Sequence, residues 1–372
     1  MGGFFICTAE FLLATRGCRG PHRRQSQYRL HWEKGSEETC VSSTAEVKSG
    51  EPEVSVERPL AGILYLLGAT TIFPVQDVII KMLSGEYAVH QVVFLRSAFA
   101  LPIVLVISRF EGQLWPLKIG SWRLQLLRGL SAFASYMVYY MALATIGLAE
   151  TAAITFTTPI FVTLLAVAFL GERIGLFRWL AVVTGLIGVA IIVQPGRGVF
   201  EPAAVLALLA AVTYAASIIA TRKLGHRTNG GTMTVVTLLI YLAAGGGLGL
   251  AFSFVDIQSP HPSFAFLFRE WKWPDPGDWL LLLAIGVTSA LGFFALSQAY
   301  RLAEASVVTP FEYTYMLWAV LWGWVFFGTL PAFSTWAGLF LIVGAGLLIV
   351  FREVVRGRRI VRRRGLGVLR QR

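Results

Sequence analysis

Ten long apolar runs constrain this chain more than any other feature. Each holds about 20 mostly apolar residues, the length that an α-helix needs to cross a bilayer. Numbered one to ten in chain order, they are 60–80, 89–108, 122–145, 149–170, 176–194, 202–221, 232–254, 279–299, 303–327 and 333–351. They lack the alternation of apolar and polar residues found in transmembrane β-strands. The sequence therefore predicts an all-α membrane protein of ten transmembrane helices.

Composition points the same way and excludes several classes of protein. The 372 residues are 56% hydrophobic and only 14% charged, whereas soluble domains carry roughly a quarter charged residues. The three cysteines, Cys7, Cys18 and Cys40, all precede the first run, so neither a structural disulfide nor a cysteine metal site is predicted. Motifs for catalysis or phosphate binding are absent from the sequence, so we expect neither an enzyme nor a cofactor.

The basic residues predict how the chain lies in the membrane. Residues 352–372 hold nine Arg and one Glu, which supply most of the net charge of +11. A basic tail after a spanning helix favours contact with anionic lipid on the cytoplasmic side, and nucleic-acid binding is not expected. With both termini cytoplasmic, the inner links hold nine Lys or Arg and the outer links four. We expect a bacterial-type inner-membrane protein, and a homodimer stays open as its assembly.

The segment before the first run differs from the rest of the chain. Residues 1–58 hold eight basic and eight acidic residues with little hydrophobic pattern. We interpret them as a disordered cytoplasmic leader, or as the result of a start codon assigned too early.

An internal repeat is the strongest sign of organisation. The triplet Leu-Ala-Glu at 148–150 recurs at 302–304, and Gly171 at the end of run four matches Gly328 at the end of run nine. The chain thus resembles five helices taken twice. Because five is odd, the second set must start from the opposite side of the membrane, which makes the repeat inverted. Inverted repeats are typical of secondary transporters, with a substrate site near the midplane.

These residues resemble the drug/metabolite transporter superfamily, in its ten-helix EamA-type branch. The resemblance is carried by YYMALATIGLAETAAITFTTPIFVTLLAVAFLGERIG at 139–175 and AYRLAEASVVTPFEYTYMLWAVLWGWVFFG at 299–328. It departs at GTLP, residues 328–331, where the family often has an acidic residue after the glycine. The resemblance implies EamA-type repeats at 59–196 and 200–352, followed by a basic cytoplasmic tail at 353–372.

Polar residues at helical spacing mark several runs as candidate walls of a cavity. Residues three and four apart share a helix face, and such polar stripes occur in runs three, four, six and nine. The candidate substrate-binding residues are Ser135, Tyr139, Thr155, Thr158, Ser217, Thr309, Glu312 and Tyr315. The alternative is that the Ser and Thr hydroxyls bond only to their own helix. Runs five and ten are Gly-rich, and we expect them to scaffold the others.

Three charges inside the runs are interpreted as structural or gating groups. Asp77 and Arg96 are placed at similar depth in runs one and two, so they could form an ion pair, with Lys81 as a competing partner one turn away. Arg128 is one turn into run three, where it can reach the interface as a structural or lipid-contacting charge.

Glu312 is the acidic residue nearest the midplane, nine residues into run nine. A carboxylate among apolar residues is costly unless it is paired or used. One reading is a substrate contact or proton-coupling site, and the other is a protonated acid bonded to a neighbouring helix.

These features favour a secondary transporter that moves a small metabolite by alternating access. The resemblance implies substrates such as riboflavin, amino acids or S-adenosylmethionine, as an importer or an exporter. Aromatic residues are frequent in the polar runs and suit a flat ring, which makes riboflavin the single best prediction. The alternative class is a membrane receptor or intramembrane enzyme without transport activity.

Overall fold

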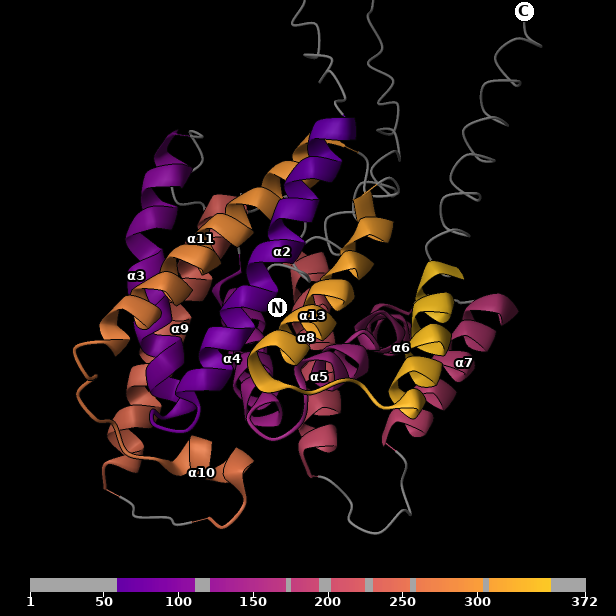
Figure 1. Ribbon diagram of the computed structural model, residues 1–372. Helices are drawn as coiled ribbons and strands as arrows, with labels where there is room; N and C mark the ends of the chain where they lie inside the picture. Colours follow the sequence, from indigo (N-terminus) through magenta and orange to yellow (C-terminus); the bar gives the residue numbers. More distant parts are fainter. Residues whose placement is uncertain are drawn as a thin grey trace, which may run out of the picture.

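A computed structural model of the chain describes residues 59–110, 121–171, 175–193, 202–224, 230–254, 259–303 and 308–348. Within these ranges the regular structure is helical (Figure 1). The predicted leader 1–58 and tail 353–372 lie outside the described residues. The elements in chain order are α2 (Pro59–Leu83), α3 (Val89–Phe110), α4 (Trp122–Leu143), α5 (Leu148–Thr155), α6 (Thr158–Leu170), α7 (Leu176–Val193), α8 (Pro202–Leu224), α9 (Gly230–Phe252), α10 (Pro262–Phe268), α11 (Asp278–Leu302), η2 (Thr309–Tyr313), α13 (Thr314–Phe327) and the helix Phe333–Leu348.

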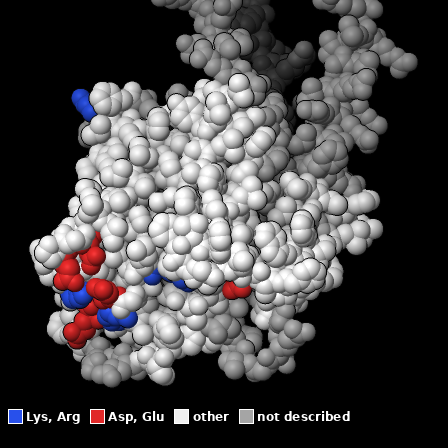
Figure 2. All heavy atoms as spheres, viewed as in Figure 1, with Lys and Arg blue, Asp and Glu red and all other residues white. Residues whose placement is uncertain are grey.

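Every predicted run overlaps a helix, which confirms the all-helical fold class. Six helices of the described residues are long and apolar enough to cross a membrane by length and composition. The count of ten spans stays a prediction. On the face shown in Figure 2 the middle of the molecule is largely uncharged, and charged side chains gather toward its lower left. Such an apolar belt is what contact with lipid requires.

The helix pairing is symmetric between the two halves of the chain. Helix α4, which is run three, packs on α8 and α9, the first two runs of the second half. Its counterpart α11, which is run eight, packs on α2 and α3, the first two runs of the first half. The contacts α3 with α9 and α5 with α13 map onto themselves when the first five runs are exchanged with the last five. The halves are therefore interleaved, and helices from both surround the interior.

The two matched runs four and nine are each interrupted at a Thr-Pro step. Run four divides into α5 and α6, with Pro159 in the first turn of α6. In run nine the 3₁₀ turn η2, which includes Pro310, directly precedes α13. Both runs end at a glycine in the left-handed conformation, Gly171 with φ 65° and Gly328 with φ 63°, where a side chain would be strained. Interrupted helices near a transporter midplane commonly flank the substrate site.

Runs five and ten pack closely on each other, at the right of Figure 1. A Cβ atom added at Gly188 of α7 would lie 2.7 Å from the carbonyl oxygen of Gly338 in the last helix. The absence of side chains thus lets the two backbones approach. This arrangement agrees with the scaffolding role predicted for the Gly-rich runs.

Candidate functional site

A buried carboxylate lies where α2, α4 and α13 meet. Asp77 of α2 is fully buried. Its Oδ2 atom accepts hydrogen bonds from Tyr139 Oη of α4, at 2.9 Å, and from Tyr315 Oη of α13. Its Oδ1 atom accepts from Tyr140 Oη at 3.5 Å. An ionised carboxylate only accepts hydrogen bonds, so three tyrosine hydroxyls suit the charged form.

A second layer of polar groups fixes the Tyr140 hydroxyl. Its oxygen accepts from Gln76 Nε2 at 2.8 Å and from Arg96 Nη1 at 3.4 Å. Gln76 in turn accepts from Ser289 Oγ of α11 at 2.5 Å. A tyrosine hydroxyl has one donor hydrogen and two acceptor lone pairs. With both lone pairs occupied, Tyr140 can only donate to Asp77, so these five side chains form one directional network.

The Tyr140 hydroxyl links Asp77 and Arg96, since it donates to the carboxylate and accepts from the guanidinium. A direct ion pair between the two charges stays a prediction. Lys81 Nζ donates to the carbonyls of Leu143 and Ile146, at 2.6 and 2.7 Å. It thereby binds the orphan carbonyls at the end of α4, as cations at helix C-termini do.

A cavity lies beside this network, between helices of both halves. It is lined by Arg96, Arg128, Ala132, Tyr136, Tyr214, Ser217, Ile218, Thr221, Thr234, Thr237, Leu238, Tyr241 and Phe293. The lining comes from α3 and α4 of the first half and from α8, α9 and α11 of the second. The volume open to the centres of water molecules is about 30 Å³, room for roughly two waters. A metabolite with rings can enter only if these helices move apart.

The cavity has aromatic walls and a cation at each end. The guanidinium carbon of Arg96 lies 4.3 Å from the ring centre of Tyr136. The Tyr136 ring meets that of Tyr241 edge-on, with centres 5.5 Å apart. Arg128 lies two turns from Tyr136 along α4, about 12 Å at about 1.5 Å per residue. The described lining residues include these two cations and no carboxylate.

Arg128 is an interior residue. It is buried, and its Nε donates to Thr221 Oγ1 at 2.9 Å. Its Nη1 donates to Thr237 Oγ1 at 2.6 Å and to the Met233 carbonyl at 3.2 Å. The predicted contact with lipid is therefore wrong, whereas the structural role agrees with these bonds. Arg128 joins α4 to α8 and α9 at the end of the cavity.

The other predicted hydroxyls differ in whether they line a cavity and in what they bond to. Ser217 lines the main cavity, and Ser135 and Thr155 line a smaller one of about 10 Å³ next to it, with Tyr139. Ser135 donates across to the Ala210 carbonyl of α8 at 2.8 Å. Thr155 and Thr158 donate to carbonyls of their own run, at 2.8–2.9 Å, which is the back-bonding alternative.

Run nine places its candidates at different positions. Tyr315 belongs to the Asp77 network. Glu312 is 5% exposed in η2 and lines neither cavity, but it is close enough to interact electrostatically with Tyr214, which lines both. The side chain of Thr309 lies outside the described part of the structure. The substrate-binding roles of these residues stay predictions.

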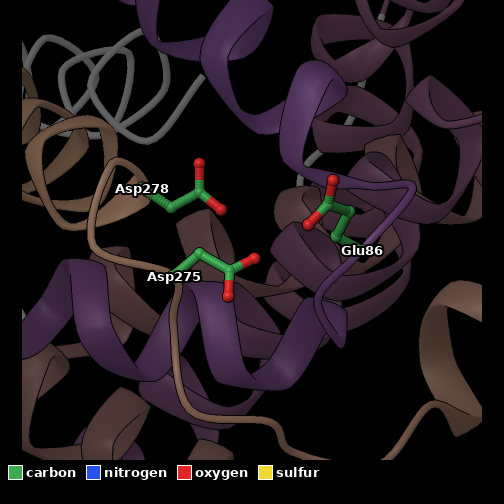
Figure 3. A group of neighbouring side chains, drawn as sticks. All are labelled: Glu86, Asp275 and Asp278. Carbon is green, nitrogen blue, oxygen red and sulfur yellow. The ribbon is translucent and has the colours of Figure 1, made fainter.

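Three acidic side chains form a separate group at the opposite end of the molecule from the start of α2. Figure 3 shows Glu86, Asp275 and Asp278 facing one another, with carboxylate oxygens within 4.8 Å. Lys272 Nζ lies 3.1 Å from Glu86 and 3.5 Å from Asp275, and the bond to Glu86 raises the pKa of Lys272. The Lys272 ammonium thus balances part of the negative charge of this group. These ion pairs connect the link before α11 to the link between α2 and α3.

The residues predicted for the site do not include Gln76, Tyr214 or Tyr241. Gln76 has no polar neighbour three or four residues away, but Tyr241 follows Thr234 and Thr237 at that spacing, and Tyr214 is three residues before Ser217. Gln76 adjoins Asp77, and that pair of polar residues in run one is the signal that was available. Tyr136 and Tyr140 stood out only as aromatic residues, because the groups they contact, such as Arg96 of α3, are on other helices.

The sequence matches a known family over most of the chain. The model of the EamA-like transporter family matches twice, at residues 60–194 and 201–351. A riboflavin transporter of Vibrio cholerae is 29% identical over 81% of this chain and 96% of its own length. A riboflavin transporter of Rhizobium johnstonii is 30% identical, over 82% and 96% respectively.

Other similar proteins differ in their named substrate. The pseudopaline exporter of Pseudomonas aeruginosa is 30% identical over 77% of this chain and 94% of its own length. One crystal structure has a TM-score of 0.52 and 16% identity, over 78% of this chain and 95% of that one, which shows a shared fold. The family and these named relatives are transporters of small molecules rather than enzymes. This chain belongs to the EamA-like transporter family.

Proposed function

We propose that the chain is a secondary transporter that carries riboflavin across the inner membrane by alternating access. The observation that carries the substrate proposal is the cavity wall, where Tyr136, Tyr214, Tyr241 and Phe293 lie on four different helices. Aromatic faces bind flat rings well, and the isoalloxazine of riboflavin is a flat ring system. Two relatives named as riboflavin transporters support the same choice.

Alternating access is supported by how the halves meet. Cavities for ligands of this size are commonly about 300–1,000 Å³, far above the roughly 30 Å³ found beside the network. Helices α3 and α4 must therefore separate from α8 and α9 to admit the ring. In the proposed cycle the separation occurs first toward one side of the membrane and then toward the other, with both termini on the cytoplasmic side.

Uptake into proteoliposomes tests this function. We expect saturable entry of radiolabelled riboflavin, in competition with unlabelled riboflavin but not with a mixture of amino acids or with S-adenosylmethionine. Empty liposomes and protein denatured before reconstitution are the controls. If labelled S-adenosylmethionine or an amino acid enters and riboflavin does not, the substrate assignment is wrong and the proposal of a secondary transporter stands. Entry of none of them would favour a membrane protein of another kind.

A further inference from the structure

Arg96 is a fully buried cation with part of its hydrogen-bonding capacity unused. Its Nη1 atom donates to Tyr140, but its Nε and Nη2 atoms have no hydrogen bond of good geometry to any of the described residues. The ring of Tyr136 covers the guanidinium, and the Tyr136 hydroxyl interacts with Arg96 electrostatically. Buried donors are nearly always satisfied in folded proteins, since leaving them unpaired is costly. Two guanidinium nitrogens without such a hydrogen bond, on a residue that lines the cavity, indicate a group that is completed by a ligand.

The positions of these atoms define the shape of that ligand group. In a guanidinium, Nε and Nη2 lie on one edge, and their two N–H bonds are parallel in the plane. Tyr140 holds the other edge, and Tyr136 covers one face. The remaining edge is thus fixed as a two-pronged donor. Such an edge matches two neighbouring acceptor atoms in one plane, as in a carboxylate.

We propose that this edge of Arg96 binds a planar group with two neighbouring acceptor atoms on the transported molecule. The inference rests on the proposed function, because it assigns a recognition group to the same cavity. A carboxylate has this form, and so does the edge of isoalloxazine that consists of the C4 carbonyl oxygen and N5, which is the edge we assign to Arg96. Arg128 at the far end of the cavity adds positive potential, and the described lining holds no carboxylate, so an electron-rich group fits better than a cation.

A small probe tests the recognition without reference to transport. Benzoate combines a flat ring with two planar oxygens, whereas benzyl alcohol keeps the ring and lacks the pair. We expect benzoate to raise the melting temperature of the purified full-length protein in a saturable manner, and benzyl alcohol to have no saturable effect. This comparison uses the unmodified chain, so it does not depend on the folding of a variant. Equal effects of the two compounds, or none from benzoate, would overturn the proposal.

A variant assigns the effect to Arg96. Arg96→Lys keeps the charge but loses the two-pronged edge, and we expect it to weaken benzoate binding roughly tenfold or more, as loss of a charge-assisted pair would. Arg109→Lys, at the exposed end of the same helix, is the matched control and should bind like the unmodified protein. Unchanged binding by Arg96→Lys would refute the assignment.

A pair of flavins connects the inference to the proposed substrate. In 5-deazariboflavin a carbon replaces the ring nitrogen of the acceptor pair. We expect the unmodified protein to bind it roughly tenfold more weakly than riboflavin, and Arg96→Lys to bind both flavins equally. If riboflavin is transported but the two flavins compete equally in the unmodified protein, the function stands and the inference fails. If benzoate binds through Arg96 and riboflavin is not transported, the inference stands and the substrate is wrong.

Discussion

Replacing Asp77 by Asn is the most informative perturbation of the buried network. The change keeps the shape of the side chain but replaces one oxygen by an NH₂ group and removes the charge. Tyr140 can only donate toward Asp77, because Gln76 and Arg96 already occupy its lone pairs. An amide nitrogen placed at Oδ1 would therefore meet a donor, and placed at Oδ2 it would meet the hydroxyls of Tyr139 and Tyr315.

The size of the effect follows from these contacts. At least one hydrogen bond to a charged acceptor is lost, worth about 1.5–3 kcal/mol. Arg96 also loses the charge that balances it through Tyr140, and breaking a buried charge pair costs about 3–5 kcal/mol. Since the Tyr140 hydroxyl links the two charges, we expect a total of about 3–5 kcal/mol. Tyr315→Phe removes one donor and leaves the charge, so it should cost about 1–3 kcal/mol.

The assay is thermal and denaturant unfolding of the purified protein in detergent, followed by tryptophan fluorescence. Ser135→Ala is a useful control, because it removes a single neutral hydrogen bond to the Ala210 carbonyl and should cost about 1 kcal/mol. If Asp77→Asn is as stable as the unmodified protein, the reasoning is refuted. Such a result would mean that residue 77 is neutral in the folded protein and that the tyrosines do not stabilise a charge.

Three further expectations concern other parts of the chain. Glu312→Gln should insert normally but transport less, or lose the pH dependence of transport; initial uptake rates against external pH that superimpose on those of the unmodified protein would remove Glu312 from the mechanism. Gly188→Val should destabilise the protein by about 1–3 kcal/mol through overpacking, whereas Gly247→Ala, where an added Cβ meets nothing within 4 Å, should be close to neutral in the same unfolding assay. A reporter that is active only in the periplasm should be silent when fused after Arg372, and a strong signal would reverse the predicted orientation.

The contrast between Glu312 and Asp77 shows where reasoning from the sequence reached its limit. Glu312 drew attention because it is an isolated acid nine residues into an apolar run. Asp77 is also in an apolar run, but Lys81 and Arg96 offered it ordinary ion-pair partners. In the structure three tyrosines from two other helices donate hydrogen bonds to it. The sequence could not show which of the two buried acids lies in the hydrogen-bond network, because the network partners of Asp77 are on helices distant in sequence.

The sequence by itself determined the helical membrane fold, the approximate bounds of the long apolar runs and the division into two similar halves, but not the short helix α10 or the breaks in runs four and nine. These properties follow from local features, because the length of an apolar run and the position of Pro or Gly act within a single segment. Only the tertiary structure decided which polar groups meet. The Asp77 network joins residues up to 238 positions apart, and rotation of one helix by a single residue, about 100°, would direct its hydroxyl elsewhere. The available edge of Arg96 cannot be read from the sequence either. It depends on Tyr140 and Tyr136, which contact the other edge and one face of the guanidinium.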